Sequence, residues 1–220
     1  MLDKLLSGIA PHHCIRCGSA ADGLCVSCKK SVQAVRLAAC VQCGCALQNG
    51  RCRTCTLADV QQDIPFAYQA EVKQLLREYK FSYRRAYARV LADLLHANSA
   101  PPANNALLVP LPTAPAHIRE RGFDHTRQIV RHLAKLQNRP YDTLLVRTKN
   151  FRQVGADRSQ RAIQAADAYH CPTRLSPRRT YILVDDVVTT GASMAAGVSA
   201  LRQAGAVHIT LLAIAHQPLE

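Results

Sequence analysis

The chain has 220 residues, of which 48% are hydrophobic and 20% charged, and its formal net charge at pH 7 is +13. This balance is that of a soluble globular protein, long enough for one ordinary domain and a small one. No run of 18 apolar residues is present, which excludes a membrane span, and the N-terminal apolar run is too short for a signal peptide. We therefore expect a cytoplasmic protein.

The positive charge is concentrated after residue 60. Residues 1–60 carry 7 basic and 3 acidic side chains, a net +4, and the rest carries 21 and 12, a net +9. Eight cysteine thiolates with two Zn²⁺ ions would add a net charge of about −4 and bring the first part close to zero. The excess on the larger part suggests a polyanionic partner, either nucleic acid or a phosphate-rich small molecule.

Cysteines are clustered near the N-terminus: nine of the ten lie between residues 14 and 55. Eight of them form four Cys-x-x-Cys pairs, made by Cys14, Cys17, Cys25, Cys28, Cys40, Cys43, Cys52 and Cys55. Two such pairs complete a closed, structural zinc site that leaves no coordination position for water. Sequential pairing gives two ribbons with one zinc each, and a crossed pairing of the first and third pairs stays open, so we expect one or two zinc ions.

The alternative to zinc binding is a set of disulfides, which are disfavoured in a chain without a secretory signal. The two remaining cysteines, Cys45 and Cys171, are expected to be small, buried apolar residues.

Beyond residue 60, helical spacing alternates with short apolar runs. Helices are predicted at 72–79, 87–95, after a cap at Asp124, and at 193–204. Strands are predicted at 106–109, 143–146, 181–184 and 207–214. A Pro/Ala/Asn stretch at 99–105 predicts a loop, and Gly205 a helix C-cap. The alternation predicts an α/β fold with a parallel sheet covered on both faces, in a domain of residues 61–220 that follows a cysteine-rich domain of residues 1–60.

Residues 181–193 contain the most specific chemical pattern. An apolar strand leads to Asp185 and Asp186, and a Thr-Thr-Gly-Ala-Ser sequence then opens a helix. Such a turn directs backbone N–H groups and hydroxyls into one concavity at a helix N-terminus, where an anion is favoured. Two adjacent carboxylates suit the paired hydroxyls of a ribose and can bind Mg²⁺. An ordinary strand–turn–helix with an acidic cap is the alternative, and the full thirteen-residue combination disfavours it.

These thirteen residues resemble the phosphoribosyl pyrophosphate (PRPP) motif of type I phosphoribosyltransferases. The whole chain resembles the ComF family, which is linked to competence and the use of external DNA in bacteria. The wider resemblance rests on the double zinc ribbon, Lys80-Phe81, Val109-Pro-Leu-Pro112, Arg119-Glu-Arg121-Gly122-Phe123, and Arg147-Thr-Lys with Gln153, Gly155 and Arg161. The chain departs from the family pattern at Asp124-His125, where Asn-Gln is usual, and at Gln164, where Asn is expected.

The resemblance implies a type I phosphoribosyltransferase fold after a small N-terminal double zinc ribbon. It implies Asp185 and Asp186 as the catalytic pair on the ribose hydroxyls, and a 5-phosphate surrounded by residues 189–193. With the arginines that would offset diphosphate charge, the expected PRPP-binding set is Asp185, Asp186, Val187, Thr189, Thr190, Gly191, Ala192, Ser193, Arg119 and Arg121. Mg²⁺ is expected with PRPP, together with a diphosphate loop after Val109 and a mobile loop between about 148 and 168.

Two functions are consistent with these observations. One is a PRPP- or ribose 5-phosphate-binding protein of DNA uptake, which binds single-stranded DNA or acts as an adaptor for a DNA-translocating ATPase. The other is a catalytically active phosphoribosyltransferase of nucleotide salvage, although no residues define a nucleobase pocket. Basic clusters at 119–135 and 84–89 favour contacts with a nucleic-acid backbone, and the scarcity of aromatic residues disfavours base stacking.

Overall fold

The computed structural model describes residues 13–82, 84–148 and 168–217. Within these ranges, five strands form a parallel sheet with the order β1-β7-β6-β3, and β2 pairs with β7 beyond β1. The strands are β1 (Gln61–Asp63), β2 (Phe66–Ala67), β3 (Ala106–Pro110), β6 (Thr180–Val188) and β7 (His208–His216). The predicted α/β class with a parallel sheet is confirmed.

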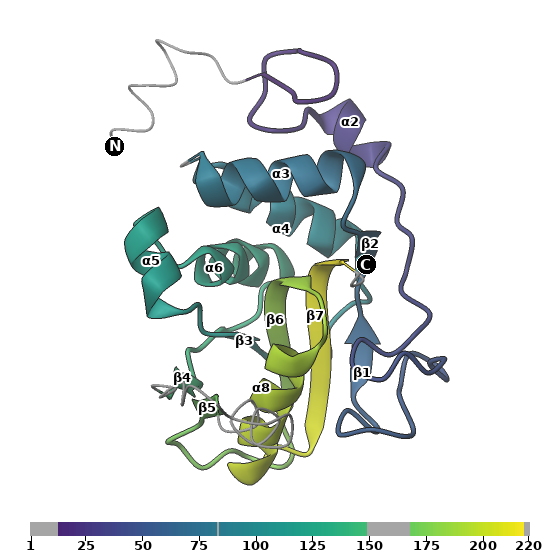
Figure 1. Cartoon of the computed structure of the whole chain (residues 1–220), viewed down its shortest axis with the longest axis vertical. Helices are drawn as coiled ribbons and strands as arrows, with labels where there is room; N and C mark the ends of the chain where they lie inside the picture. The colour runs from purple at the N-terminus through teal and green to yellow at the C-terminus, as the bar shows by residue number, and fades with distance from the viewer. Residues whose placement is uncertain (1–12, 83, 149–167, 218–220) are drawn as a thin grey trace, which may run out of the picture.

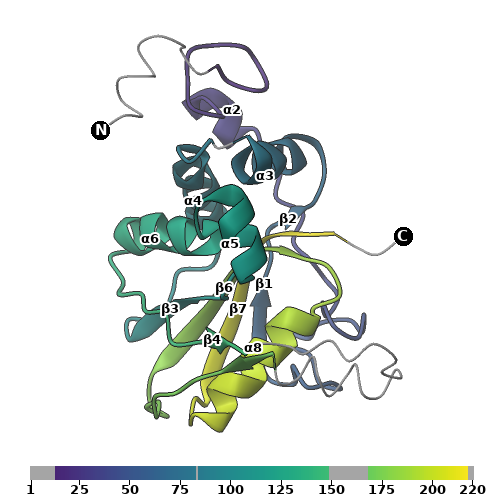
Figure 2. The same ribbon diagram turned by 60° about the vertical axis from the view of Figure 1, so that its left-hand side comes forward.

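Helices cover both faces of this sheet (Figure 1 and Figure 2). One face carries α4 (Tyr87–Asn98) and α6 (His125–Gln137), with α3 (Ala70–Phe81) packed on α4, and the other face carries α8 (Ala192–Gln203). Because side chains alternate along a strand, β6 supplies both cores: Ile182 and Val184 join the core under α4 and α6, and Leu183 joins the core under α8. Each face therefore has its own apolar core.

The predicted helices are confirmed, with small shifts at their ends. The carboxylate of Asp124 caps α6 as expected, accepting a hydrogen bond from the Arg127 N–H at 3.0 Å. The predicted cap at Gly205 is wrong by one residue: Ala204 is the C-cap of α8, and Gly205 follows it with a φ of +108°. The positive φ is needed just after the cap, which is why a glycine stands there.

The structure also contains a helix that the apolar spacing did not predict, α5 (Pro115–Arg121). It begins with proline in its first turn and ends at Gly122, which adopts the left-handed conformation. Both are ordinary boundary signals, since proline tolerates the first helical position and glycine the C-terminal one. The seven-residue helix has too little apolar periodicity to be found by spacing alone.

Three predicted strands are confirmed, and β6 continues through the acidic pair to Val188 because it stays paired with β7. The strand predicted at 143–146 is largely wrong. Only its last residue forms a strand, β4 (Val146–Arg147), which pairs antiparallel with β5 (Tyr169–His170). Beside β3, the chain forms a single β-bridge, between Leu108 and Tyr141. The apolar residues after Tyr141 therefore do not pair with β3, and Leu145 packs into the core under α8.

The two cysteine groups lie on different parts of the α/β fold. Cys14, Cys17, Cys25 and Cys28 surround one point, near the short helix α2 (Val26–Lys30), and Cys40, Cys43, Cys52 and Cys55 surround another. Sequential pairing is therefore confirmed and crossed pairing is wrong. The first group packs into the core with α3 and α4, and the second into the core with α8, so each ribbon shares a core with the sheet. The division at residue 60 stays a prediction.

The two cysteines outside these groups are not buried as expected. Cys45 is exposed and Cys171 is partly exposed. Cys171 still packs against the core under α8. In the described ranges, no helix is long and apolar enough to cross a membrane.

Replacing a core residue of β6 tests the two-core architecture. Leu183 is fully buried, and Leu183→Ala should lower the free energy of unfolding by about 2–5 kcal/mol, since it leaves a cavity under α8. The measurement is denaturant unfolding with zinc present. The control Val146→Ala changes a residue that is 44% exposed and should cost less than about 0.5 kcal/mol. Equal losses in the two variants would contradict the assignment of Leu183 to a packed core.

Candidate functional site

The acidic pair lies where β6 approaches its C-terminal end, the edge at which ligands collect in parallel α/β sheets. Asp186 is buried and Asp185 is half-buried. The Asp185 carboxylate accepts hydrogen bonds from the Asp186 N–H at 2.8 Å and from the Thr126 hydroxyl at 3.4 Å. The Asp186 carboxylate accepts from the Val187 N–H at 2.6 Å. Backbone and side-chain donors therefore fix both carboxylates.

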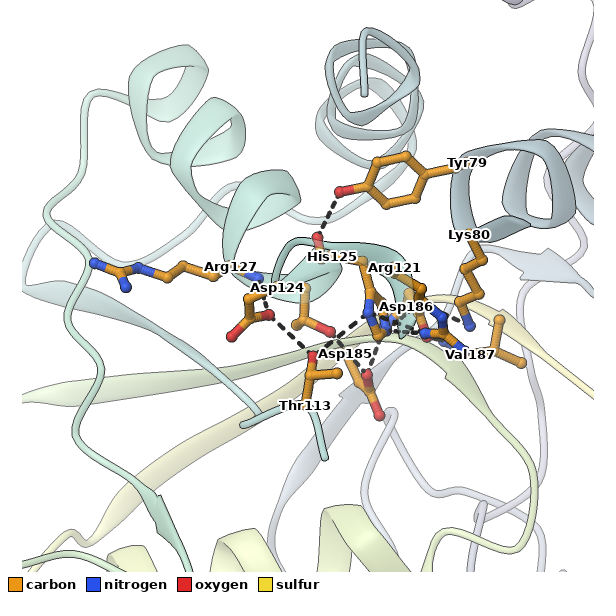
Figure 3. Close-up of polar contacts among 11 residues, drawn as sticks. Tyr79, Lys80, Thr113, Arg121, Asp124, His125, Arg127, Asp185, Asp186 and Val187 are labelled. Atoms are coloured by element: carbon orange, nitrogen blue, oxygen red, sulfur yellow. Dashed lines mark hydrogen bonds and ion pairs between the residues drawn. The ribbon is translucent and has the colours of Figure 1, made fainter. Parts of the chain in front are cut away.

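Two cationic or polar side chains from different helices converge on Asp186 (Figure 3). Lys80, near the end of α3, places its Nζ 2.8 Å from Asp186 Oδ2, and His125, the first residue of α6, places its Nε2 3.0 Å from the same oxygen. The Tyr79 hydroxyl donates to the His125 carbonyl oxygen at 2.7 Å and so ties α3 to α6. Three segments distant in sequence thus meet at one carboxylate.

His125 lies between Arg121 and Asp186. Arg121 Nη1 lies 3.1 Å from His125 Nδ1 and 3.5 Å from His125 Nε2. His125 Nε2 in turn lies 3.0 Å from Asp186 Oδ2, the oxygen that also contacts the Lys80 ammonium.

The two carboxylates titrate in opposite directions. Burial and the neighbouring charge of Asp186 raise the pKa of Asp185 to about 7, although its hydrogen bonds and the Lys80 ammonium act to lower it. Burial also acts to raise the pKa of Asp186, but the Lys80 ammonium and the hydrogen bond from His125 outweigh it and hold that pKa well below its usual range. Near neutral pH, Asp186 is ionised and Asp185 is poised between its two forms.

The predicted anion-binding turn follows directly. Thr189, Thr190, Ala192 and Ser193 are exposed, and Gly191 is the buried N-cap of α8 with a φ of +70°. The Thr190 hydroxyl accepts from the Ala192 N–H at 3.3 Å. Tyr169 of β5 borders this turn through a side-chain hydrogen bond with Ser193. Burial raises the pKa of Tyr169, and the charge of Arg147 and this hydrogen bond partly offset the rise. The turn therefore presents hydroxyls and helix N-terminal amides beside the carboxylate pair.

The two predicted arginines are placed differently. Arg121 is buried in the network described above, and its guanidinium stacks on the Phe81 ring, 5.1 Å from the ring centroid. Arg119 is exposed on α5. Val187, the remaining predicted residue, is partly buried and packs against the core under α3, α4 and α6.

The loop after β3 runs beside the acidic pair. The Leu111 N–H donates to the Val184 carbonyl at 2.8 Å, which holds the loop against β6. Farther along it, the Thr113 hydroxyl donates to Asp124 at 2.9 Å. This is the segment expected to hold a diphosphate, and the structure brings it to the site. The expected mobile loop between about 148 and 168 lies outside the described residues.

Four site residues were missing from the set predicted by sequence: Lys80, Thr113, His125 and Thr126. Lys80 and His125 stand in or beside the segments that carry the family resemblance, but their roles depend on where α3 and α6 cross the sheet. Helical spacing identifies which face of a helix is buried, and it does not say which strand residue that face will meet.

Both cysteine groups fit a tetrahedral zinc ion. A zinc ion with four Zn–S bonds of 2.3 Å places its sulfurs about 3.8 Å apart. The Sγ atoms lie 3.7 Å apart for Cys17 and Cys25 and 3.6 Å apart for Cys43 and Cys52. Within each group, all four Sγ atoms are within 4.8 Å of one another. Backbone N–H groups donate to three of the sulfurs at 3.4 Å, those of Cys25, Cys52 and Cys55.

No known protein family profile and no curated protein sequence matches the chain. Similar solved structures include "structure of the allosteric regulatory enzyme of purine biosynthesis", with 16% identity and a TM-score of 0.43 over 59% of this chain. Another is glutamine PRPP amidotransferase from B. subtilis complexed with ADP and GMP, with 17% identity and a TM-score of 0.42 over 58%. The chain covers 26% of each of these proteins. Likeness at this level carries no inference about chemistry.

The raised pKa of Asp185 makes stability depend on pH. Because this pKa is higher in the folded than in the unfolded protein, ionisation of Asp185 weakens the fold as pH rises from about 4 to about 7. Asp185→Asn removes that loss. The difference in unfolding free energy between Asp185→Asn and wild type should therefore increase, in favour of the variant, by about 1–2 kcal/mol between pH 5.5 and 8. This is less than the full pKa shift of Asp185 would give, because the side chain keeps some solvent contact.

Denaturant unfolding of both proteins at the two pH values measures this difference. The exposed Asp142→Asn serves as the control and should show no such change. A difference between Asp185→Asn and wild type that is the same at both pH values would contradict the assignment.

Proposed function

We propose that the chain binds PRPP, or a related ribose 5-phosphate ligand, at the C-terminal edge of β6. One observation carries the proposal: the fixed carboxylate pair, Asp185 and Asp186, stands two residues before the Thr-Thr-Gly-Ala-Ser turn at the N-terminus of a twelve-residue helix, and all residues of that turn except Gly191 are exposed. The turn suits the 5-phosphate, and the carboxylates suit the ribose hydroxyls.

The charges around the pair support an anionic ligand. Two isolated carboxylates would repel a phosphate group. Lys80 Nζ lies 2.8 Å from Asp186 Oδ2. The Arg121 guanidinium contacts His125, the other neighbour of Asp186, at 3.1 Å. Together these two cations offset the two carboxylates, so the helix N-terminal amides and hydroxyls of residues 189–193 set the local preference for an anion.

The two carboxylates suit different tasks. Asp186 is committed to Lys80 and His125 and positions its neighbours. Asp185 is partly exposed and faces fewer cations, so we assign it the hydroxyls of the ribose. Hydrogen bonds from those hydroxyls favour the ionised carboxylate, so ligand binding is expected to lower the pKa of Asp185.

Phosphoribosyl transfer is the chemistry that such a site would serve. A nucleophile attacks C1 of PRPP, the bond between C1 and the diphosphate oxygen breaks, and pyrophosphate leaves with the electron pair. Mg²⁺ bound with PRPP would neutralise charge on the diphosphate. The chain's own part is to orient the ribose through Asp185 and hold the 5-phosphate at residues 189–193. The loop after Val109 lies beside the acidic pair, where the diphosphate would be held.

Ligand binding is tested with paired substitutions. Asp185→Asn with Asp186→Asn should weaken PRPP binding in the presence of Mg²⁺ by about 100-fold or more, because two charge-assisted interactions are lost. Isothermal titration calorimetry measures the affinity. Thr190→Ala alone, which leaves the buried network intact, should weaken both PRPP and ribose 5-phosphate by about fivefold. Asp142→Asn is the control.

Three further outcomes follow from the same assay. Wild-type protein that binds neither PRPP nor ribose 5-phosphate would refute the proposed function. Pyrophosphate release from PRPP with a nucleobase would establish transfer. Binding without release under any base would establish a ligand-binding role.

A basic surface on α6 favours a second function, contact with DNA. Arg127, Arg131 and Lys135 are exposed and recur every four residues, so they share one face of the helix. Burial lowers the pKa of His132 on this helix, and the charges of Arg89, Lys135 and Arg131 lower it further. The part of this lowering that comes from Arg89, Lys135 and Arg131 shows that their positive charges lie close together around His132. With the ComF resemblance, this surface leads us to propose single-stranded DNA and a DNA-translocating ATPase as partners in DNA uptake.

Charge reversal tests the DNA proposal. Replacing Arg127, Arg131 and Lys135 by Glu should abolish binding of single-stranded DNA at moderate salt. In wild type, each phosphate contact contributes about −0.7 to the slope of log affinity against log salt, so three contacts give a slope near −2. Fluorescence anisotropy between 50 and 200 mM salt measures it. Reversal of Lys30, Arg174 and Arg178, which are exposed elsewhere, is the matched control. Equal losses in both variants would refute a specific surface.

A further inference from the structure

The second cysteine ribbon, residues 38–60, touches the anion-binding turn directly. Val41 lies in the knuckle between Cys40 and Cys43, and Gly191 is the glycine of the turn. A Cβ on Gly191 would lie 2.7 Å from the Val41 carbonyl oxygen and 2.9 Å from Val41 Cγ2. The knuckle backbone therefore lies against the turn with no room for a side chain, and Gly191 is required both for its positive φ and for this close approach.

The position of Val41 depends on a bridge from β1. The Gln62 side chain is 6% exposed, and its Oε1 accepts from the Val41 N–H at 3.1 Å. Its Nε2 donates to Cys40 Sγ at 3.3 Å. A metal-bound thiolate accepts such a hydrogen bond more strongly than a neutral thiol does, and partners of this kind orient the ligands of metal sites. Gln62 thus links the metal-bound or metal-free state of Cys40 to the backbone of Val41, which contacts Gly191.

The same ribbon also holds the far end of α8. Arg202 donates to the carbonyl oxygens of Thr56 and Ala58 at 2.8 Å and 2.7 Å, just after the last cysteine of the group. Between these two attachments, Val41 and Leu57 pack into one core with Met194 and Val198. The ribbon therefore spans α8 from the N-terminal turn to the last turn.

The first ribbon, residues 13–31, has no comparable contact among the described residues. It packs on α3 and α4, where a Cβ on Gly23 would meet Leu75 at 3.0 Å. Lys29 pairs with Asp93 at 2.6 Å, and Arg16 pairs with Glu71, in the first turn of α3. The Arg16–Glu71 pair lies at the opposite end of α3 from Lys80, and the Lys29–Asp93 pair lies on α4.

We propose that a metal bound by Cys40, Cys43, Cys52 and Cys55 holds the 189–193 turn in its ligand-binding shape, so that metal and ribose-phosphate binding strengthen each other at this ribbon and not at the first. The proposal rests on the proposed function. Its positioning residues are Val41 and Gln62. Without the metal, the four cysteines lose their common ligand, and hydrogen bonds such as that from the Thr56 hydroxyl to Gln42 and that from the Val41 N–H to Gln62 are left to hold the knuckles. Val41 is then held less firmly against Gly191. Small displacements of positioning groups are costly for binding and catalysis.

Reciprocity supplies a test on the unmodified protein. If the metal strengthens ligand binding, the ligand must strengthen metal binding by the same factor. The full chain, loaded with two zinc ions, is titrated with a colorimetric chelator at equilibrium, with and without ribose 5-phosphate at about 100 times its dissociation constant. We expect one of the two zinc ions to become about tenfold or more harder to remove, and the other to change by less than about twofold.

Variants identify the protected ion. With Cys17→Ser and Cys25→Ser, the remaining zinc should still be protected by the ligand. With Cys43→Ser and Cys52→Ser, the remaining zinc should be unprotected. Gln62→Leu, with both zinc ions bound, should weaken ribose 5-phosphate binding by about tenfold, whereas the control Gln33→Leu, at an exposed position, should not change it.

The failures of the two proposals are distinguishable. Calorimetry that detects no ribose 5-phosphate binding by the zinc-loaded wild type refutes the proposed function and the coupling with it. Ligand binding that protects neither zinc ion, or protects both equally, refutes the coupling alone.

Discussion

The burial of an ionised carboxylate at the end of β6 is the constraint on which the site depends. A buried charge is tolerated only when it is paired and hydrogen-bonded, and removal of one partner of such a pair is strongly destabilising. Asp186 meets this requirement with Lys80 from α3 and His125 from α6. The same contacts that satisfy the charge therefore fix where two helices cross the sheet. The contacts that stabilise the fold and the proposed ligand site therefore involve the same few atoms.

Each cysteine ribbon also combines two sources of stability. A short cysteine-rich segment cannot bury much apolar surface by itself, and metal binding usually supplies the missing stability. Here each ribbon also shares a core with one face of the sheet, the first with α3 and α4 and the second with α8. Figure 1 shows the two ribbons at separate places along the fold, joined by an extended segment. They are attached to two different layers, and among the described residues it is the second ribbon that contacts the 189–193 turn, through Val41 and Gly191.

Much of the fold and part of the site could be predicted from sequence. Apolar spacing located α3, α4, α6 and α8, and the strand–acid–turn pattern at 181–193 located the acidic pair and the turn, because those signals are local. The partners of Asp186 are not local. Lys80 and His125 become neighbours only through helix crossing, and the exposure of Arg119 against the burial of Arg121 reflects a short helix that spacing did not reveal. The contact of Val41 with Gly191 likewise joins segments that no motif connects.

The order of the strands has a consequence for how the protein is made. β1 follows the second ribbon early in the chain, yet its partner in the sheet is β7, the last strand among the described residues. During synthesis, the ribbon and β1 leave the ribosome long before the surface that they cover exists. Long-range strand pairing of this kind slows folding and leaves apolar edges exposed in the meantime. An early zinc ion on the knuckles would keep this segment compact while it waits for the rest of the sheet.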